Sequence, residues 1–189
     1  MKVAIIVGST RPGRKADAVA RWAYDIAAKR GDAEFEVVDI ADFNLPLLDE
    51  AMPPMAGRYM NEHTKEWAAK IASFDAFVFV TPEYNRSTSA ALKNALDYLF
   101  AEWNDKAVAF ISYGFAGGLR AVEQLRLIVA ELKMASVRSS VGLTFGEDFQ
   151  GYADFTPRET QEGYLTTTLD EVVAWGVALK TVREAAAAA

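Results

Sequence analysis

The chain has 189 residues, of which 51% are hydrophobic and 24% charged, enough for one globular domain (1–189) with a full-sized core and too few for two. Its formal net charge of −6 is unfavourable for a nucleic-acid-binding surface, so we expect no nucleic-acid partner. The sequence contains no cysteine and one histidine, which argues against disulfides, thiol chemistry and a metal site. Any redox function would therefore need a bound cofactor.

The apolar stretches of the sequence are short. The apolar run 3–7 is too short for a signal peptide, and no stretch approaches the length of a membrane span, so we expect a cytoplasmic protein without a membrane partner. The alanines at 185–189 favour a helix but carry no packing information. We expect this tail to fray from the last helix.

The stretch 76–100 predicts a strand, a loop and a helix in succession. Five apolar residues, 76–80, are typical of a parallel strand buried on both faces. After a polar loop, the leucines within 92–99 mark one face of an amphipathic helix, with Ser87 or Ser89 as its N-cap. The loop between them would lie beyond the carboxyl end of a strand, where parallel α/β sheets bind ligands.

The rest of the chain repeats the alternation of strand and helix. Further strands are predicted at 3–7, 35–40, 107–111 and 137–145, and further helices carry buried stripes within 19–26, 67–74, 122–132 and 169–179. A capping box, Thr168 to Glu171, is expected to open the last helix. Right-handed crossovers on this order predict a three-layer α/β/α sandwich around a five-stranded parallel sheet.

Two irregular segments, 41–59 and 146–165, interrupt the alternation. The first is unusually apolar for a surface loop, so it either covers a site, meets another subunit or folds onto its own core. The second is rich in glycine and aromatic residues. His63 lies in a polar stretch, and we expect it at the surface and outside catalysis.

The turn at 8–15 has the groups that a monophosphate needs. It offers hydroxyls, amides near a helix N-terminus, and three cations, Arg11, Arg14 and Lys15. It matches neither a Walker A loop nor a dinucleotide-binding turn. The alternative is a basic surface turn.

Three motifs together resemble the NADPH-dependent FMN reductase family of flavodoxin-like flavoproteins, which includes quinone, azo-compound and chromate reductases. The longest is TPEYNRSTSAALKNALDYL at 81–99. The second is Gly8-Ser9-Thr10-Arg11-Pro12-Gly13, followed by Arg14 where the family usually has serine, and the third is Ser112-Tyr113-Gly114 with Gly117-Gly118. The resemblance covers residues 3–145 and implies the flavodoxin-like strand order 2-1-3-4-5.

The resemblance also implies a set of FMN-binding residues. Ser9 and Arg11 would hold the phosphate, and Arg14 would either pair with it or point to solvent. Pro82, Glu83, Tyr84 and Asn85 would follow the edge of the flavin, with Glu83 in a positional role, and Ser112, Tyr113, Gly114, Gly117 and Gly118 would form the second wall. The alternatives are ordinary turn residues at 82–85, with Tyr84 as a lid on the core, and glycines that serve only a strand-to-helix turn.

We expect an FMN-dependent oxidoreductase that takes hydride from NADPH or NADH and passes electrons to a small-molecule acceptor such as a quinone, an azo compound or free flavin. No side chain need act as an acid or base, because the flavin carries the chemistry. The alternatives are a non-enzymatic electron carrier or flavin-binding protein, and a protein that keeps the fold without the cofactor. Arg11 and Arg14 argue against a flavodoxin-type carrier, whose phosphate loop is typically rich in serine and threonine.

The family further implies a homodimer or homotetramer. Ala91, Ala95 and Tyr98 form a second apolar stripe on the helix after the flavin loop, and this stripe would pack against a partner subunit. Deeper burial within the same subunit is the alternative.

Overall fold

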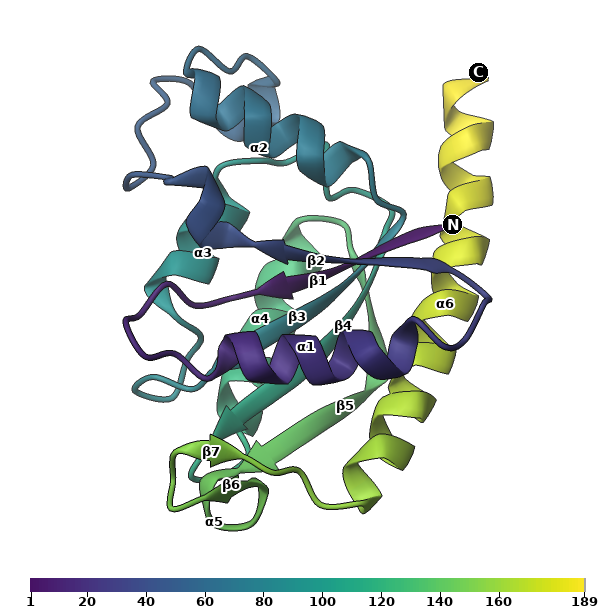
Figure 1. Ribbon diagram of the computed structural model, residues 1–189. Helices are drawn as coiled ribbons and strands as arrows, with labels where there is room; N and C mark the ends of the chain where they lie inside the picture. Colours follow the sequence, from purple (N-terminus) through teal and green to yellow (C-terminus); the bar gives the residue numbers. More distant parts are fainter. Residues whose placement is uncertain (189) are drawn as a thin grey trace.

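The structure is a computed structural model that describes residues 1–188, and its strands and helices alternate along the chain (Figure 1). The elements are β1 (Lys2–Val7), α1 (Ala16–Ala27), β2 (Glu34–Asp39), the 3₁₀ turns η1 (Ile40–Phe43) and η2 (Pro54–Ala56), α2 (Glu62–Ala72), β3 (Ala76–Pro82), α3 (Ala90–Asp97), β4 (Ala107–Gly114), α4 (Leu119–Glu131), β5 (Ala135–Thr144), α5 (Phe145–Asp148), β6 (Phe149–Gln150), β7 (Asp154–Phe155) and α6 (Thr160–Ala187).

The five long strands form one parallel sheet in the order β2-β1-β3-β4-β5, which confirms the predicted flavodoxin-like topology. β3 and β4 are buried along their whole length on both faces, as expected of continuous apolar strands in the middle of such a sheet. β6 and β7 form a separate antiparallel hairpin after β5.

Alternate residues of the central strands enter two separate cores. Ile5, Val78 and Ala109 pack with α1 and α6, whereas Ile6, Phe79 and Phe110 pack with α2, α3 and α4. The second core contains Trp67 and Trp103, whose rings lie 6.1 Å apart. Helices therefore cover both faces of the sheet, and the predicted three-layer sandwich is confirmed.

The N-cap of α3 is one of the two predicted serines. The Ser89 hydroxyl accepts a hydrogen bond of 3.0 Å from the Leu92 amide and donates one of 2.6 Å to the Gly8 carbonyl. It thus satisfies a free amide of the first helical turn and also ties α3 to the loop after β1.

The prediction that a capping box at Thr168 opens the last helix is wrong. α6 begins at Thr160, and Thr168 is fully buried in its interior. The Thr168 hydroxyl donates to the Tyr164 carbonyl at 2.8 Å, one turn back, and Thr167 bonds to Gly163 in the same way. Threonine can satisfy its hydroxyl within a helix as well as at a cap, and the sequence pattern does not separate the two uses.

The helix α6 continues through Ala187, so it includes most of the alanine tail that was expected to fray. Residue 189 of that tail lies outside the described residues. None of the helices in residues 1–188 combines the length and apolar composition that a bilayer span requires. The same residues contain no cluster of three acidic or histidine side chains suited to a metal ion.

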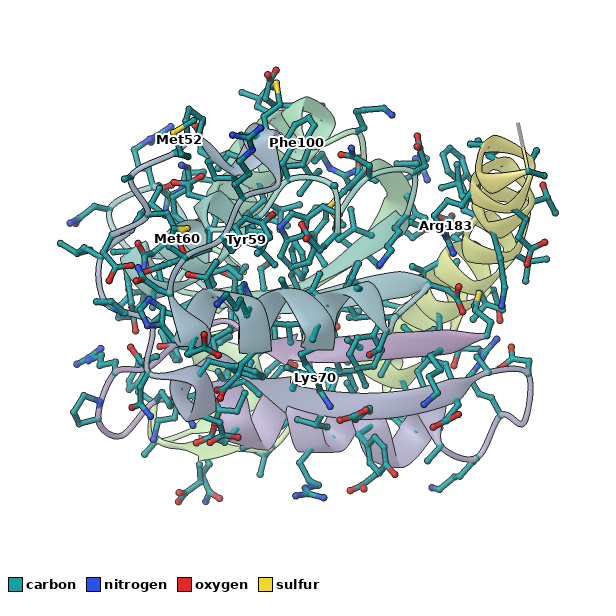
Figure 2. All side chains as sticks on the ribbon, turned by 90° about the horizontal axis from the view of Figure 1, so that it is seen from above. Met52, Tyr59, Met60, Lys70, Phe100 and Arg183 are labelled. Carbon is teal, nitrogen blue, oxygen red and sulfur yellow. The ribbon has the colours of Figure 1, made fainter. Side chains whose placement is uncertain are left out.

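The apolar segment 41–59 folds along α2 and α3 and buries one side of α3. The Tyr98 hydroxyl donates to the Pro46 carbonyl at 3.1 Å and lies 3.0 Å from the Asp49 carboxylate, so Tyr98 is buried within the subunit. This arrangement supports the alternative of intramolecular burial for the second stripe of α3. Met52, Met60 and Tyr59 all lie in the upper left part of the view in Figure 2, and both methionines are exposed.

Candidate functional site

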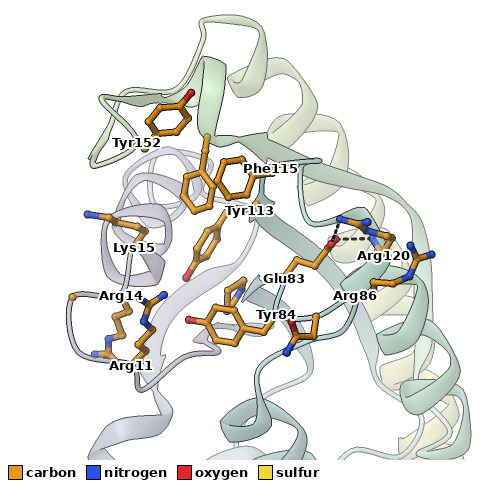
Figure 3. A pocket seen from close by; sticks show the side chains of 15 residues that line it. Arg11, Arg14, Lys15, Glu83, Tyr84, Arg86, Tyr113, Phe115, Arg120 and Tyr152 are labelled. Atoms are coloured by element: carbon orange, nitrogen blue, oxygen red, sulfur yellow. Dashed lines mark hydrogen bonds and ion pairs between the residues drawn. The ribbon is translucent and has the colours of Figure 1, made fainter.

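A cavity of about 560 Å³ opens at the carboxyl ends of β1, β3 and β4 (Figure 3). This is the edge where parallel α/β sheets bind ligands, and the volume is within the range of roughly 300–1,000 Å³ that is usual for small-molecule sites. Eight of the twelve predicted site residues line it: Arg11, Arg14, Pro82, Glu83, Tyr84, Asn85, Tyr113 and Gly114. The other four, Ser9, Ser112, Gly117 and Gly118, shape the loops behind it.

The cavity is strongly cationic although the whole chain is acidic. Its lining contains one carboxylate, Glu83, and five cations: Arg11, Arg14, Lys15, Arg86 and Arg120. Figure 3 shows Arg11, Arg14 and Lys15 on one side, with Arg86 and Arg120 on the other. Such a distribution favours a ligand with negative charge.

The loop after β1 is fixed by a close approach to β3. A Cβ atom at Gly8 would lie 2.6 Å from the Val80 carbonyl oxygen, so this position needs glycine. Ser9 is buried, and its hydroxyl accepts a long hydrogen bond of 3.4 Å from the Arg11 amide. The Arg11 side chain is exposed at the cavity.

Arg14 lines the cavity but is engaged by neighbouring carboxylates. Its guanidinium forms a two-point ion pair with Asp39, at the end of β2, and its Nε lies 2.8 Å from Asp17. Burial lowers the pKa of Arg14, but the hydrogen bonds to Asp39 and Asp17 outweigh burial and raise it above the ordinary arginine value. Arg14 therefore carries a permanent charge that Asp39 and Asp17 already neutralise.

The segment after β3 forms a tight two-residue turn. The Tyr84 amide donates to the Ser87 carbonyl at 2.9 Å, and the Ser87 amide returns a bond of 3.1 Å to Tyr84. The two central residues, Asn85 and Arg86, have φ angles of 50° and 69°. Positive φ at both positions defines a type I′ turn, and asparagine is one of the few residues that adopt it readily. The turn holds Tyr84 and Asn85 at the cavity.

Glu83 links this turn to α4. Its side chain is 7% exposed, forms an ion pair with Arg120, and accepts a hydrogen bond of 3.2 Å from the Arg120 amide in the first turn of α4. A carboxylate is stabilised at a helix N-terminus by the free amides and the helix dipole. Glu83 therefore joins the loops after β3 and β4 into one wall.

The loop after β4 depends on two glycines in the left-handed region. Gly117 and Gly118 both have φ of 71°, and a Cβ at Gly118 would lie 2.7 Å from the Ser112 Cβ. The Ser112 hydroxyl donates to the Gly117 carbonyl at 2.7 Å. These three residues close the strand-to-helix turn, and the turn brings Gly114 and Phe115 to the cavity.

Tyr113 presents a polar atom with no partner in the described protein. Its side chain is 3% exposed, it lines the cavity, and its hydroxyl makes no hydrogen bond with residues 1–188. Burial raises the pKa of Tyr113, so the hydroxyl stays protonated and can donate. In Figure 3 this hydroxyl points toward Arg14 and Lys15. Buried polar atoms normally have a partner, and a polar ligand in the cavity would supply one.

Aromatic side chains form the third side of the cavity, and the sequence did not identify them. Phe115 packs against Phe145 with ring centroids 5.4 Å apart, and against Tyr152 at 6.2 Å. Phe115 and Tyr152 are 82% and 64% exposed. We call Phe115, Phe145 and Tyr152 the aromatic wall. They come from three segments, so no periodic pattern connects them, and the only signal was the aromatic content of 146–165, which includes Tyr152 but neither phenylalanine of the wall.

A buried carboxylate anchors the hairpin that carries Tyr152. Asp148 is fully buried and accepts hydrogen bonds from the Thr144 amide at 2.9 Å, from the Arg158 Nε at 3.1 Å and from the Gln161 side chain at 3.2 Å. Burial acts to raise the pKa of Asp148, but the Arg158 and Thr144 hydrogen bonds prevail and lower it. These bonds connect the start of the hairpin to β5 and to the start of α6.

Comparison with known proteins gives consistent matches. The family model for NADPH-dependent FMN reductases matches residues 1–148. An NAD(P)H-dependent FMN reductase of Nectria sp. is 42% identical over 156 residues, covering 78% of each chain. A quinone reductase of Pseudomonas putida is 36% identical over 139 residues, covering 70% of this chain and 71% of the relative. A solved structure, a flavoenzyme NAD(P)H:(acceptor) oxidoreductase from Paracoccus denitrificans, matches with a TM-score of 0.73 and 24% identity, over 93% of this chain and 96% of that one.

Proposed function

The chain belongs to the NADPH-dependent FMN reductase family, and we propose that its cationic cavity holds the FMN through which this oxidoreductase works. FMN is the cofactor and NAD(P)H the co-substrate of the family. When bound, FMN supplies the redox chemistry, since it accepts hydride from a nicotinamide and passes electrons to an acceptor. The work of the chain is binding and orientation.

The observation that carries this assignment is the position of the unpaired Tyr113 hydroxyl. It is buried in the same cavity as Arg11 and Lys15, at the carboxyl ends of the central strands. A phosphate or ribityl oxygen placed there would accept a hydrogen bond from this hydroxyl, and the two cations would balance the phosphate charge. The residues present therefore fit the cofactor. Amides of the loop after β1, near the start of α1, complete the phosphate site.

The remaining predicted residues surround the flavin ring in this proposal. Pro82, Glu83, Tyr84 and Asn85 border one edge, and the backbone amide and side chain of Asn85 provide donors for its polar rim, because the Glu83 and Tyr84 amides already donate to carbonyls of the protein. Gly114 forms the second wall, and Ser112, Gly117 and Gly118 hold that wall in place. Donors fixed beforehand at the ring stabilise the negative charge that develops when it is reduced.

The acceptor in this proposal is a small flat molecule such as a quinone or an azo compound. Phe115 and Tyr152 offer it exposed aromatic surface, and an electron-poor ring stacks well on the negative face of such side chains. The quinone reductase among the relatives agrees with this class. Arg86, on the other side of the cavity, would favour acceptors that carry negative charge.

Assembly and location complete the proposal. We place the contact of a homodimer or homotetramer on the exposed apolar residues of segment 47–60, among them Leu47, Met55 and Met60, because these lose water contact when two copies meet. The cytoplasmic location expected from the sequence belongs to the same proposal. Sedimentation of the wild type against Met60→Glu tests the contact, since a shift to monomer is expected.

A visible absorption spectrum with added FMN, followed by anaerobic NADPH in the same cuvette, tests the function. A perturbed flavin spectrum that NADPH bleaches is the expected result. Unperturbed free-flavin absorbance would contradict the cofactor assignment, and a bound flavin that neither NADPH nor NADH bleaches would indicate a carrier.

A further inference from the structure

Arg14 is the best-connected side chain of the loop after β1. Its Nη1 donates to the Ser9 carbonyl at 2.5 Å and to Asp39 Oδ1 at 2.9 Å, its Nη2 pairs with Asp39 Oδ2, and its Nε bonds to Asp17. A guanidinium has five N–H donors, so these contacts use four of them. Its side chain is 16% exposed. Little of Arg14 is left to meet a ligand.

The charges around Arg14 lead to the same conclusion. One guanidinium faces two carboxylates, so the group formed by Arg14, Asp17 and Asp39 carries a net negative charge. Such a group repels a phosphate dianion. The cations available to the phosphate are Arg11, which is exposed, and Lys15, which also lines the cavity.

The contacts of Arg14 determine which way the loop faces. The Arg14 side chain holds the Ser9 carbonyl, and the Arg14 amide holds the Arg11 carbonyl at 3.0 Å. Carbonyl oxygens would repel a phosphate, and both are turned toward Arg14. Amide groups of the same loop are thereby left for an anion, as in other anion-binding turns.

Asp39 is a firm anchor for this arrangement. It lies in register with Val7 at the end of β1, and its Oδ1 also accepts a hydrogen bond of 2.9 Å from the Ala41 amide. The ion pair therefore connects the loop after β1 to the end of β2 and to the first 3₁₀ turn. Two-point pairs of this kind fix orientation as well as charge.

We propose that Arg14 is a positioning residue, which holds the loop at 8–15 in its phosphate-binding shape through Asp39 and makes no contact with the phosphate itself. The proposal rests on the proposed function in one respect, namely that this loop receives the phosphate of FMN.

The test compares two variants, each of which removes the charge of one carboxylate that contacts the Arg14 guanidinium. Asp39→Asn and Asp17→Asn each remove one negative charge beside Arg14, but only Asp39→Asn breaks the two-point pair. The dissociation constant of FMN is measured by quenching of flavin fluorescence on titration of cofactor-free protein. If Arg14 acts through Asp39, Asp39→Asn binds FMN about tenfold more weakly than Asp17→Asn, as expected for the loss of a strong charge-assisted pair. If Arg14 contacts the phosphate, Asp39→Asn frees its charge and binds FMN more tightly, which would overturn the proposal.

Two further readouts separate position from charge. Arg14→Lys keeps the charge but loses the two-point geometry, so it should bind FMN as weakly as Arg14→Gln; near-wild-type binding by Arg14→Lys would refute the positioning role. The salt dependence of FMN binding should stay unchanged in Arg14→Gln and become shallower in Arg11→Gln, because screening acts on the cation that faces the phosphate. A shallower dependence in Arg14→Gln would contradict the proposal.

Riboflavin, which lacks the phosphate, separates this proposal from the proposed function. The wild type should prefer FMN to riboflavin, and the Arg14 variants should reduce that preference while riboflavin binding stays constant. Equal wild-type affinity for the two would overturn the assignment of the phosphate to this loop. Circular dichroism and thermal unfolding of each variant confirm that it is folded.

Discussion

Lys106 predicts a pH dependence of stability at the edge of the sheet opposite the cavity. Its ammonium is buried, donates to the Ile71 carbonyl at 3.0 Å at the end of α2, and lies 5.5 Å from the centre of the Phe77 ring. Burial is the main cause that lowers the pKa of Lys106 from 10.5 to about 8, the charge of Arg183 adds to it, and Asp75 opposes it. The folded protein therefore holds a lysine that loses its proton unusually early.

The sign and size of the effect follow from proton linkage. Between the folded value of about 8 and the unfolded value of 10.5, the unfolded chain binds more protons than the folded one, so the free energy of unfolding rises with pH in this window. At about 1.4 kcal/mol for each pH unit between the two values, the charged ammonium destabilises the fold by about 3 kcal/mol near neutral pH. Most of this is recovered by about pH 10.

Urea unfolding of cofactor-free wild type and Lys106→Met, followed by tryptophan fluorescence, measures the effect. The unfolding free energy of the wild type relative to the variant should rise by about 2–3 kcal/mol between about pH 7 and pH 10. Loss of the hydrogen bond to Ile71 adds only a constant offset. Lys29→Met, at an exposed lysine, should leave the wild-type pH profile unchanged. A Lys106→Met difference that is flat across this range would refute the reasoning, because it would mean that Lys106 keeps an ordinary pKa.

Three further predictions concern the cavity and its support. Asp148→Asn should lower the unfolding free energy by about 1–3 kcal/mol at neutral pH, since it weakens the buried hydrogen bonds from the Thr144 amide and the Gln161 side chain, and an unchanged urea midpoint would contradict this. Phe115→Ala and Tyr152→Ala should each weaken binding of a naphthoquinone to the oxidised flavoprotein about 2- to 10-fold without changing FMN affinity. Calorimetric titration measures both affinities, and a parallel loss of FMN affinity would assign the aromatic wall to the cofactor. Gly118→Ala should destabilise the protein and weaken FMN binding, because it is strained at φ of 71° and crowds the strand before it. Gly163→Ala is the matched control, since its Cβ would enter open space on a helix and should stabilise by about 0.5–1 kcal/mol.

The central strands were predictable because each is a continuous apolar run that ends in a polar loop, whereas their order in the sheet was implied by the family resemblance. The residues at 76–80 and 107–111 are buried on both faces, and the loops that follow them meet at the cavity as the topology requires. Local chemistry also narrowed the N-cap of α3 to Ser87 or Ser89, and the structure selects Ser89, whose hydroxyl accepts a hydrogen bond from the Leu92 amide. In each case the pattern that identifies the element lies within a few residues.

The rest of the site depends on contacts that sequence spacing does not reveal. Arg14 and Asp39 meet only because β1 and β2 pair in register, so the sequence left open whether Arg14 faces the phosphate or solvent. The aromatic wall requires Phe115 and Tyr152 to converge from different loops. At Thr168 the local pattern was misleading. A motif that is typical of a helix start lies in the interior of α6, which begins at Thr160.

The position of α6 near the end of the sequence affects the time during synthesis at which the protein can bind its cofactor. Leu165, Leu169 and Val172 complete the core on the face that α1 covers, and all three follow the segment 1–148 that the family shares. On the ribosome, all five strands of the large sheet and the cavity loops after β1, β3 and β4 emerge before this helix does, and until it docks, the apolar face beneath it remains open to water. Domains fold as units during synthesis. Each new molecule should therefore capture FMN late, after its last helix has left the ribosome, and a nascent chain halted before residue 160 should bind none.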